Sequence, residues 1–471
     1  MFKKISEFFA GVLRKIFTKD GVTLDPSRVM VFGFLAVILI GAVLLSQPWA
    51  TVQGEIRWID ALFTATSATC VTGLATVDPG STFTIWGQIV LLFLMEVGGL
   101  GIMTFSTFFV LSLGGRVSFG DRAFFKDNVS FVGTTNMLNV LHVVLVTVLI
   151  VELVGASLLF CKFIQTMPID KAAFFAIFHA VSSFCNCGFA LFTDNLIGYR
   201  GDILVNVTVM ALIIIGGIGF LVYEEIFLKI KGWIFKKKTQ PLSLQSKLVL
   251  ITSTVLIIFG ALFIYLMESK NVFDHMPFKD TVLASFFQSV TSRTAGFNTI
   301  DLGMITNGTA LVIIVLMFIG GSPASCAGGI KTTTFSIITL LILSKIKGKN
   351  SVSAFHRKLP SGTVAKAIAL FFAASLFVFV MTVILEITET RGIFTPDNRD
   401  KFLTLFFETV SAFGTVGLSM GVTPALTFAG KWVIITCMFV GRVGPLALAL
   451  LVIAEETEEL YEYPEESVMT G

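Results

Sequence analysis

Long apolar segments alternate with short polar loops along the whole chain. A segment must be apolar over about 20 residues to cross a hydrocarbon core of ~30 Å. Eight segments meet this requirement: 29–47, 85–111, 139–161, 203–228, 247–267, 309–343, 363–387 and 429–453. Within each successive pair lies a shorter apolar stretch of about a dozen residues, which is typical of a re-entrant helix. The pattern therefore predicts an all-α integral membrane protein with eight transmembrane helices.

Composition supports this class and excludes several others. Of the 471 residues, 55% are hydrophobic and 14% are charged, which is far from the balance of an ordinary soluble enzyme. A net charge of +3 gives no argument for nucleic-acid binding. No HExxH, GxSxG or Walker A motif is present, so we expect neither an enzyme nor a resident cofactor. The six cysteines have no metal-ligand spacing, which predicts no zinc site and no disulfide framework.

The basic residues predict the orientation in the membrane. One set of loops carries 21 lysines and arginines and the opposite set carries ten. The positive-inside rule then places both termini in the cytoplasm and the re-entrant stretches outside a cell (plasma) membrane. Residues 1–28 are basic and amphipathic but lack the apolar stretch and cleavage site of a signal peptide, so we expect them to lie on the cytoplasmic membrane surface. The acidic segment 455–471 is expected to be a solvated helix end or a partner contact.

A fourfold internal repeat runs through the chain. The re-entrant stretches align on four glycines, each with a phenylalanine ten residues earlier: Gly73 and Phe63, Gly188 and Phe178, Gly296 and Phe286, Gly417 and Phe407. A second glycine recurs in the following span, at Gly98, Gly216, Gly320 and Gly441. The repeating unit is therefore span, re-entrant helix, glycine loop, span. It predicts units at 29–111, 139–230, 247–345 and 363–454, arranged around a pseudo-fourfold pore.

The glycine loops are the candidate ion-binding site. A short helix that stops within the membrane must turn back through non-helical backbone, and glycine adopts positive φ most readily. Four such loops around one axis would surround it with carbonyl oxygens, which replace the hydration shell of K⁺. The residues before each glycine carry no charge, which favours coordination by the backbone. These residues are Val71 and Thr72, Asn186 and Cys187, Thr294 and Ala295, and Thr415 and Val416.

The sequences CVTGL, NCGF, RTAGF and TVGL, with GGSPASCAGGIKTTT and GRVGPLALAL, resemble the Ktr/Trk/HKT superfamily of K⁺-translocating subunits over residues 25–455. Eight spans without an extra N-terminal pair are more similar to the membrane subunit of Ktr systems than to that of Trk systems. Glycine at all four loop positions implies K⁺ selectivity, because plant members that favour Na⁺ carry serine at the first. The resemblance also implies Na⁺ as an additional activator. It implies a homodimer docked on a ring of RCK-type subunits, KtrA- or KtrC-like, that bind ATP, ADP or NAD(H).

Two features break the fourfold pattern and are candidates for a gate. The sixth segment is interrupted by a glycine- and proline-containing stretch through which a helix cannot persist. By resemblance it is an intramembrane gating loop, with Lys331 at its cytoplasmic end, made of Gly320, Gly321, Pro323, Ala324, Ser325, Cys326, Ala327, Gly328 and Gly329. In the fourth unit Arg442 stands where the other units have glycine. Because an arginine in an apolar span usually faces an aqueous path, we expect it to form an electrostatic barrier with this loop.

Each of these interpretations has an alternative. The loop glycines and the span glycines (Gly98, Gly101, Gly216, Gly219 and Gly444) would also permit close helix packing, which is favoured for the span set. Arg442 could form an ion pair with Glu96 or Glu408, and the break could be a passive kink. Asp78, Asp194 and Asp301, which follow three of the loop glycines, could concentrate cations or cap turns. His179 is expected to be a satisfied buried residue, and Glu152 is a functional candidate without a known partner.

Alternative functions also remain open. A Na⁺-coupled secondary cation transporter or a Trk-like (TrkH-like) K⁺ subunit would account for much of the same pattern. Inverted repeats, which are typical of many secondary transporters, do not fit, because each unit crosses the membrane an even number of times and all units share one orientation.

Overall fold

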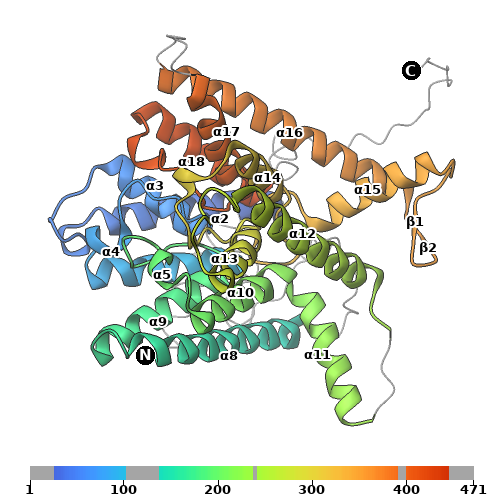
Figure 1. Ribbon diagram of the computed structural model, residues 1–471, viewed down its shortest axis with the longest axis horizontal. Coiled ribbons are helices and arrows are strands. Elements are labelled where there is room, and N and C mark those ends of the chain that lie inside the picture. Colours follow the sequence, from blue (N-terminus) through green and yellow to red (C-terminus); the bar gives the residue numbers. More distant parts are fainter. Residues whose placement is uncertain (1–25, 102–136, 237–240, 391–398, 445–471) are drawn as a thin grey trace, which may run out of the picture.

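The computed structural model describes residues 26–101, 137–236, 241–390 and 399–444, and this part of the chain is almost entirely helical (Figure 1). The predicted N-terminal amphipathic segment lies almost wholly outside these residues, as does the acidic tail. Each unit begins with a long helix: α2 (Pro26–Leu45), α8 (Met137–Phe163), α12 (Leu244–Glu268) and α16 (Ser361–Thr390). Among the described residues, three helices are long and apolar enough to cross a membrane: Val144–Phe163, Leu244–Glu268 and Ser361–Thr390; a fourth span would result if one bent pair of helices crosses together.

A shorter helix follows in each unit. These helices are α3 (Trp58–Thr69), α9 (Ile169–Phe184), α13 (Phe278–Thr291) and α17 (Arg399–Gly414). At about 1.5 Å per residue, helices of this length fall short of a hydrocarbon core of ~30 Å. An aspartate in the first turn of α3, α9 and α13 complements the positive end of the helix dipole (Asp60, Asp170 and Asp280). Each short helix packs against the long helix of its own unit.

A second apolar helix completes each unit: α5 (Ile85–Leu100), α10 (Ile203–Ile218), α14 (Asn307–Phe318) and α18 (Phe428–Val443). All four begin with a side-chain cap that accepts a backbone N–H, from Thr84, Asp202, Thr306 and Thr427. In the last three units, a side chain of the long helix also binds the residue that caps the second helix. Glu268 accepts from the Thr306 N–H at 2.8 Å, and Glu389 accepts from the Thr427 N–H at 3.1 Å.

In the second unit the reinforcement is an ion pair between Lys162 and Asp202, with 2.8 Å between Nζ and Oδ2. Partial burial raises the pKa of the Asp202 carboxyl, but the hydrogen bonds from Lys162 and from the Val205 N–H outweigh it and hold the pKa below its ordinary value. The long and second helices of a unit are thus joined at one end.

Three of the second helices end at a glycine in an unusual conformation. Gly101, Gly219 and Gly444 follow α5, α10 and α18 with φ of +78°, +94° and +94°. The predicted span over 203–228 is therefore bent at Gly219, where α11 (Phe220–Ile234) continues at 106° to α10. Packing among the described residues does not explain Gly101 and Gly444, where a methyl group would meet none of their atoms within 4 Å. These glycines end helices because they adopt positive φ without a steric cost.

Close packing does explain the glycine that recurs within the second helix in three units. A methyl group at Gly98, Gly216 or Gly441 would collide with the carbonyl oxygen of Thr69, Phe184 or Phe413, respectively. Each of these carbonyls lies four residues before the loop glycine of the same unit. The second helix of the unit therefore lies directly against the end of the short helix, as the sequence predicts for Gly98 and Gly216.

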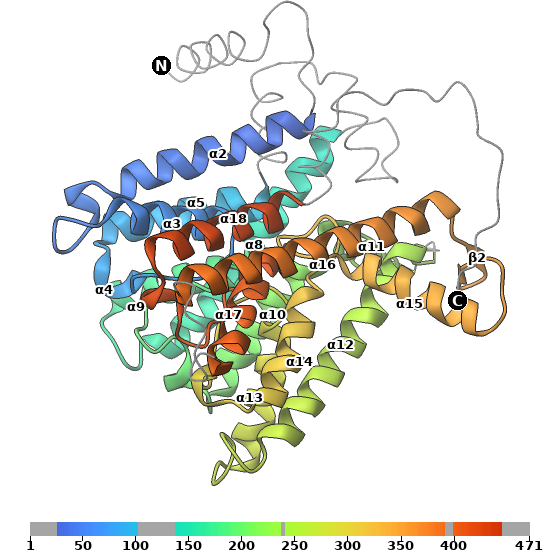
Figure 2. The ribbon, with the colours of Figure 1, turned by 90° about the horizontal axis from the view of Figure 1, so that it is seen from above.

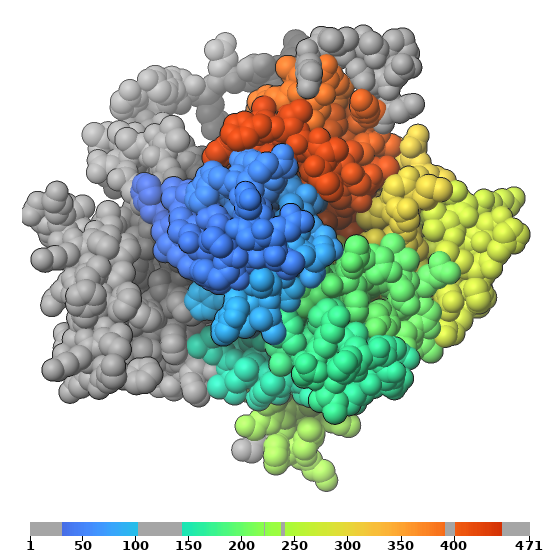
Figure 3. Space-filling model, turned by 90° about the vertical axis from the view of Figure 1, so that its left-hand side faces the viewer, coloured from blue at the N-terminus to red at the C-terminus, as the bar shows by residue number. Residues whose placement is uncertain are grey.

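The units form a closed ring. Each second helix packs on the short helix of the next unit: α5 on α9, α10 on α13, α14 on α17, and α18 on α3. Figure 3 shows the result on one face of the molecule, where the blue, green, yellow and orange-red parts of the chain meet around one point. The last helix thus contacts the first unit, which places the four loop glycines near one another.

The opposite end of the molecule carries a different set of elements. Helix α15 (Thr332–Ile346) is followed by a hairpin of β1 (Ser353–Ala354) and β2 (Arg357–Lys358), paired antiparallel. Phe355 and His356 in its turn both have positive φ, as a two-residue type I′ turn requires. Figures 1 and 2 place α11, α15 and the hairpin at the right-hand end. The short helix α4 (Pro79–Thr82) lies at the left-hand end of both views. The described residues also form 3₁₀ turns at Pro48–Ala50, Ile197–Tyr199, Leu302–Met304 and Thr423–Ala425.

Candidate ion-binding site

The four glycine loops share one unusual backbone conformation. The loop glycines have φ of +89° at Gly73, +81° at Gly188, +77° at Gly296 and +90° at Gly417. The residue two positions earlier is also left-handed, with φ of +56° at Val71, +59° at Asn186, +71° at Thr294 and +50° at Thr415. Positive φ in β-branched valine and threonine is rare, and such strain is concentrated at functional sites. Its repetition in all four units marks these loops as the candidate site.

The loops contact one another in a ring. A methyl group at each loop glycine would collide with the carbonyl oxygen of the residue that precedes the glycine of the next unit. The pairs are Gly73 with Cys187, Gly188 with Ala295, Gly296 with Val416, and Gly417 with Thr72. Because the fourth pair returns to the first unit, the series closes on itself. Backbone carbonyl oxygens of neighbouring units therefore lie side by side, and no charged side chain belongs to the ring.

Hydrogen bonds to the short helices hold three of these loops in place. The N–H groups of Thr72, Cys187 and Val416 each donate, at 2.8 Å, to the carbonyl of a serine five residues earlier. In units one and four the serine hydroxyl also accepts from the glycine N–H: Ser67 from Gly73 at 3.0 Å and Ser411 from Gly417 at 3.1 Å. In a trans peptide the C=O points opposite to the N–H. The carbonyls of Thr72 and Val416, which share a peptide with the N–H groups of Gly73 and Gly417, therefore point away from the short helix of their own unit.

The third unit departs from this pattern by one position. The predicted register of its phenylalanine is wrong, because Phe286 is 40% exposed whereas its three counterparts are buried. The fully buried residue is Phe287. The loop anchor shifts in the same direction, since the Ala295 N–H donates to Thr291, four residues earlier, at 3.0 Å. Because Phe286 and Phe287 are adjacent, the sequence does not show which of them is buried. The one-residue offset between helix and loop is therefore apparent only in the structure.

Arg293 lies directly before the third loop, and the sequence did not single it out. Its guanidinium is buried and donates to the Ser253 and Gly320 carbonyls, at 3.4 Å in both cases. Arg293 thus connects the third glycine loop to the start of the interrupted segment. The sequence signal was a lone arginine within an apolar re-entrant stretch, which is unusual in itself.

The segment between α14 and α15 lies beside the fourth glycine loop. No helix is present from Ile319 to Lys331. A methyl group at Gly328 would collide with the Thr415 side chain, and Gly329 lies against the backbone of Gly414.

On its other side this segment is hydrogen-bonded to the end of α10. The N–H groups of Ser322 and Cys326 donate to Gly217 and Gly216 at 3.0 and 3.1 Å. The Ala324 carbonyl accepts from Phe220 at 3.0 Å. The segment is therefore held between the second and fourth units. Lys331 precedes α15, and its ammonium donates to the Ala327 carbonyl at 2.7 Å.

Arg442 contacts this segment directly. Its guanidinium donates to the carbonyl of Cys326 and to that of Gly98, with a longer contact of 3.5 Å to Gly99. Among the described residues it forms no ion pair with Glu96 or Glu408, so the structural-pair alternative is not observed. The arginine instead bridges the end of α5 to the interrupted segment.

The remaining candidates have structural roles. His179 is buried, with Nδ1 2.7 Å from the Phe175 carbonyl and Nε2 accepting from the Leu191 N–H at 3.3 Å. It is a satisfied neutral imidazole, as predicted. Asp78 and Asp301 cap turns by accepting from Gly80 and Gly303 at 3.1 and 2.9 Å.

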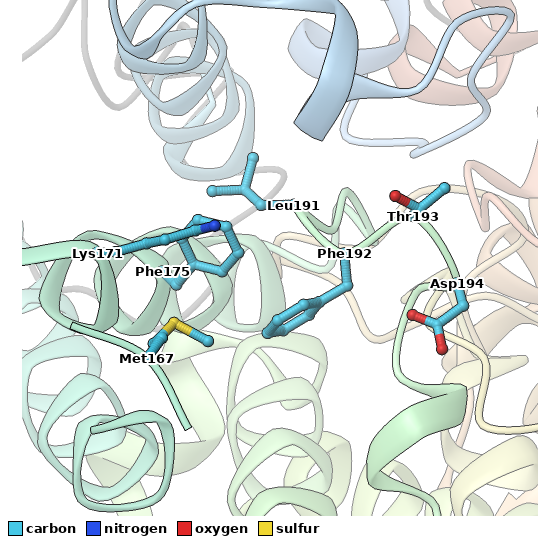
Figure 4. A pocket seen from close by; sticks show the side chains of 7 residues that line it. All are labelled: Met167, Lys171, Phe175, Leu191, Phe192, Thr193 and Asp194. Atoms are coloured by element: carbon cyan, nitrogen blue, oxygen red, sulfur yellow. The ribbon is translucent and has the colours of Figure 1, made fainter. Parts of the chain in front are cut away.

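Two other acidic groups are placed by the fold. Glu408 accepts from Thr423, which ties α17 to the chain beyond the fourth loop. Asp194 lines a shallow cavity of about 340 Å³ beside the second unit. Figure 4 shows this cavity between Lys171 and Phe175 of α9 and the segment that ends at Asp194.

A buried ion pair that the sequence did not reveal closes the ring. Lys431 of α18 and Asp60 of α3 are 2.6 Å apart, and both side chains are almost fully buried. Arg57 also contacts Asp60, at 2.8 Å, but its side chain is 74% exposed. Asp60 and Lys431 are 371 residues apart, so only the closed fold brings them together.

We expect Asp60→Asn to lower the unfolding temperature in detergent strongly, because it leaves a buried ammonium without a carboxylate. Breaking a buried pair from one side typically costs about 3–5 kcal/mol. Arg57→Ala is the control, since an exposed pair contributes roughly 0–1 kcal/mol. The double variant Asp60→Leu with Lys431→Met should regain most of the loss. Equal melting of Asp60→Asn and Arg57→Ala would show that the buried pair does not stabilise the ring.

A helical protein with membrane-length apolar helices and a ring of backbone carbonyls is a membrane cation transporter in class. The family model of TrkH, described as cation transport protein, matches residues 25–463. The chain belongs to the TrkH family of cation transport proteins. It is therefore an integral membrane protein and an ion transporter, not an enzyme.

Relatives agree with this assignment over nearly their full length. The chain is 39% identical to Ktr system potassium uptake protein B of Bacillus subtilis (strain 168), covering 96% of this chain and 98% of the relative. It is 37% identical to the potassium/sodium uptake protein NtpJ of Enterococcus hirae, covering 95% and 98%. Among solved structures, the potassium transporter TrkH from Vibrio parahaemolyticus superposes with a TM-score of 0.68 at 20% identity, covering 92% of this chain and 86% of that one.

Proposed function

We propose that this chain is the K⁺-selective, pore-forming subunit of a K⁺ uptake system. The observation that carries the proposal is the closed series of contacts between loop glycines and the preceding carbonyls of the next unit. In this proposal K⁺ is the substrate and is coordinated by the backbone of the three residues that end in each loop glycine. The filter residues are Val71, Thr72, Gly73, Asn186, Cys187, Gly188, Thr294, Ala295, Gly296, Thr415, Val416 and Gly417.

Three features support K⁺ as the ion. Carbonyl oxygens are the ligands that replace the hydration shell of K⁺. The C-terminal ends of α3, α9 and α13 lead into the loops, and helix C-termini favour cations. The Bacillus subtilis relative is named for potassium uptake. A Na⁺-coupled cation transporter is the second candidate, and the potassium/sodium name of the Enterococcus relative favours it.

The membrane arrangement follows from the same proposal. Eight crossings would form four units around a pseudo-fourfold pore in the plasma membrane, with the glycine loops toward the outside and both termini in the cytoplasm. The closed order of inter-unit helix contacts supports the fourfold arrangement. By resemblance, two such chains would form a homodimer with one pore in each protomer.

Residues 320–331 and Arg442 would form the gate in this proposal. Its support is the contact of Gly328 with the Thr415 side chain, together with the bridge from Arg442 to the Cys326 carbonyl. An obstruction held there would lie next to the filter, on the side that faces α15. Opening would require the segment to give up its hydrogen bonds to α10 and Arg442.

A cytosolic RCK-type subunit that binds nucleotide would control this gate. The start of α12, which carries Lys247, lies beside the hairpin, which carries Arg357 and Lys358. Two contacts join these regions: the Lys247 ammonium lies 5.5 Å from the centre of the Phe355 ring, and Leu244 packs against the cluster that contains Val352 and Leu359. Basic residues gathered here would suit a protein partner. The relative that is named as part of a Ktr system supports such a partner.

The proposal is tested in cells that lack their own K⁺ uptake. We expect the chain, expressed with its regulatory subunit, to restore growth at low external K⁺ and to take up Rb⁺ as a K⁺ tracer. Expression without the partner should give uptake that no longer responds to nucleotide. Growth restored only by added Na⁺, with stoichiometric Na⁺ entry, would favour the Na⁺-coupled alternative. A correctly inserted protein that moves neither ion would contradict the proposal.

A further inference from the structure

Three side chains with metal-binding atoms meet behind the second glycine loop. They are Glu96 of α5, Glu152 of α8 and Cys185, which caps the end of α9. Their ligand atoms all lie within 4.8 Å of one another, and Cys185 Sγ is 3.9 Å from Glu96 Oε2. Ligands of one tetrahedral Zn²⁺ lie roughly 3.5 Å apart, so small movements of these side chains would let them share one ion. The cluster is not part of the proposed filter or gate.

The two carboxyl groups lack a cationic partner. Among the described residues, neither Glu96 nor Glu152 forms an ion pair. Glu152 is only 6% exposed, and its Oε1 has no hydrogen-bond partner. Burying one unpaired carboxylate is costly, and placing a second beside it adds repulsion. A bound cation removes both penalties.

The interrupted segment passes beside this cluster. The Cys326 N–H donates to the Gly216 carbonyl at 3.1 Å, and Gly216 lies against the carbonyl of Phe184, the residue directly before Cys185.

We propose that Glu96, Glu152 and Cys185 bind a divalent cation of the Zn²⁺ class, with water as the fourth ligand. Mixed sulfur and oxygen ligands suit this borderline-soft ion, whereas Mg²⁺ and Ca²⁺ require oxygen ligands in larger number. Glu96 is partly exposed and provides the entry path.

The bound ion would join α5, α8 and the end of α9, to which its ligands belong. It would therefore stiffen the helices beside which the interrupted segment lies. The sequence predicted no zinc site because these ligands are far apart along the chain and include carboxylates that no short motif connects.

The test is a Co²⁺ titration of the purified full-length chain in detergent micelles. Co²⁺ reports thiolate ligands through a charge-transfer band and four-coordinate geometry through intense visible bands. We expect one equivalent to bind with both signatures, and Zn²⁺ to displace it. Glu152→Gln and Cys185→Ser should each weaken binding at least ~10-fold, by the loss of one ligand. Cys437→Ser removes a buried thiol of α18 outside the cluster and is the matched control.

A thermal-unfolding measurement guards against misfolded variants. Zn²⁺ should raise the unfolding temperature of the wild type and of Cys437→Ser, and should do so much less for Glu152→Gln. Absence of the thiolate band would overturn the proposal, as would equal affinity in Glu152→Gln and the wild type. In that case the two carboxyl groups merely share a proton. Neither readout depends on transport, so the result is independent of whether the chain conducts K⁺.

Discussion

Gly73→Ser is expected to abolish the preference of the protein for K⁺ over Na⁺. A side chain at Gly73 would collide with the Cys187 carbonyl oxygen, which must move out of the ring. The left-handed backbone at φ +89° adds a further cost of about 1–2 kcal/mol for any residue with a Cβ. Because K⁺ selectivity depends on the number and position of carbonyl ligands, we expect the K⁺/Na⁺ uptake ratio to fall ~10-fold or more.

The control for this variant is Gly54→Ser. Gly54 also has positive φ, at +78°, but a side chain there meets nothing within 4 Å. It therefore reproduces the backbone strain without the collision in the ring. Uptake of Rb⁺ and of Na⁺ is measured for both variants at matched expression. An unchanged ratio in Gly73→Ser, or equal loss in both variants, would contradict the assignment of the filter.

Arg442→Ala is expected to raise basal K⁺ flux and to uncouple it from the regulatory subunit. The guanidinium bridges the Cys326 and Gly98 carbonyls, and the alanine variant leaves the interrupted segment without this contact. A hydrogen bond to a charged group contributes about 1.5–3 kcal/mol, so the equilibrium of the segment should shift roughly ten- to hundredfold toward release. Rb⁺ efflux from proteoliposomes, with and without the partner, measures the effect.

Arg442→Lys separates the two physical roles of this side chain. Lysine keeps the positive charge but lacks the planar fork that reaches two carbonyls at once. If the charge alone forms the barrier, Arg442→Lys should behave like the wild type. If the bridge is required, it should leak nearly as much as Arg442→Ala. Unchanged K⁺ uptake, Na⁺ leak and regulation in Arg442→Ala would rule out both roles.

The sequence predicted the class of protein and the position of the glycine loops for local reasons. Membrane-length apolar segments are a property of composition, and a positive φ at a glycine is a property of one residue and its neighbours. Both can therefore be recognised without knowledge of distant contacts. The repeat added the expectation that the loops converge, because four equal units cannot each bury the same polar backbone alone.

The residues at which helices end, and the side chains that they bury, were harder to predict from the sequence. Hydrophobicity continues past Gly219, so an apolar window cannot reveal that α10 ends there and α11 turns by 106°. The adjacent residues Phe286 and Phe287 differ in burial although they are chemically identical. In both cases the deciding factor is backbone geometry or the fit against a neighbouring helix, which the apolar pattern does not encode.

Only the tertiary structure decided which charged groups meet. Asp60 pairs with Lys431, Arg442 bridges α5 and the interrupted segment, and Glu96 faces Glu152. A buried charge is costly unless a partner is present, so each such residue signals in the sequence that a partner exists. The identity of that partner depends on the order in which the four units close into a ring, because this closure brings residues hundreds of positions apart within hydrogen-bonding distance.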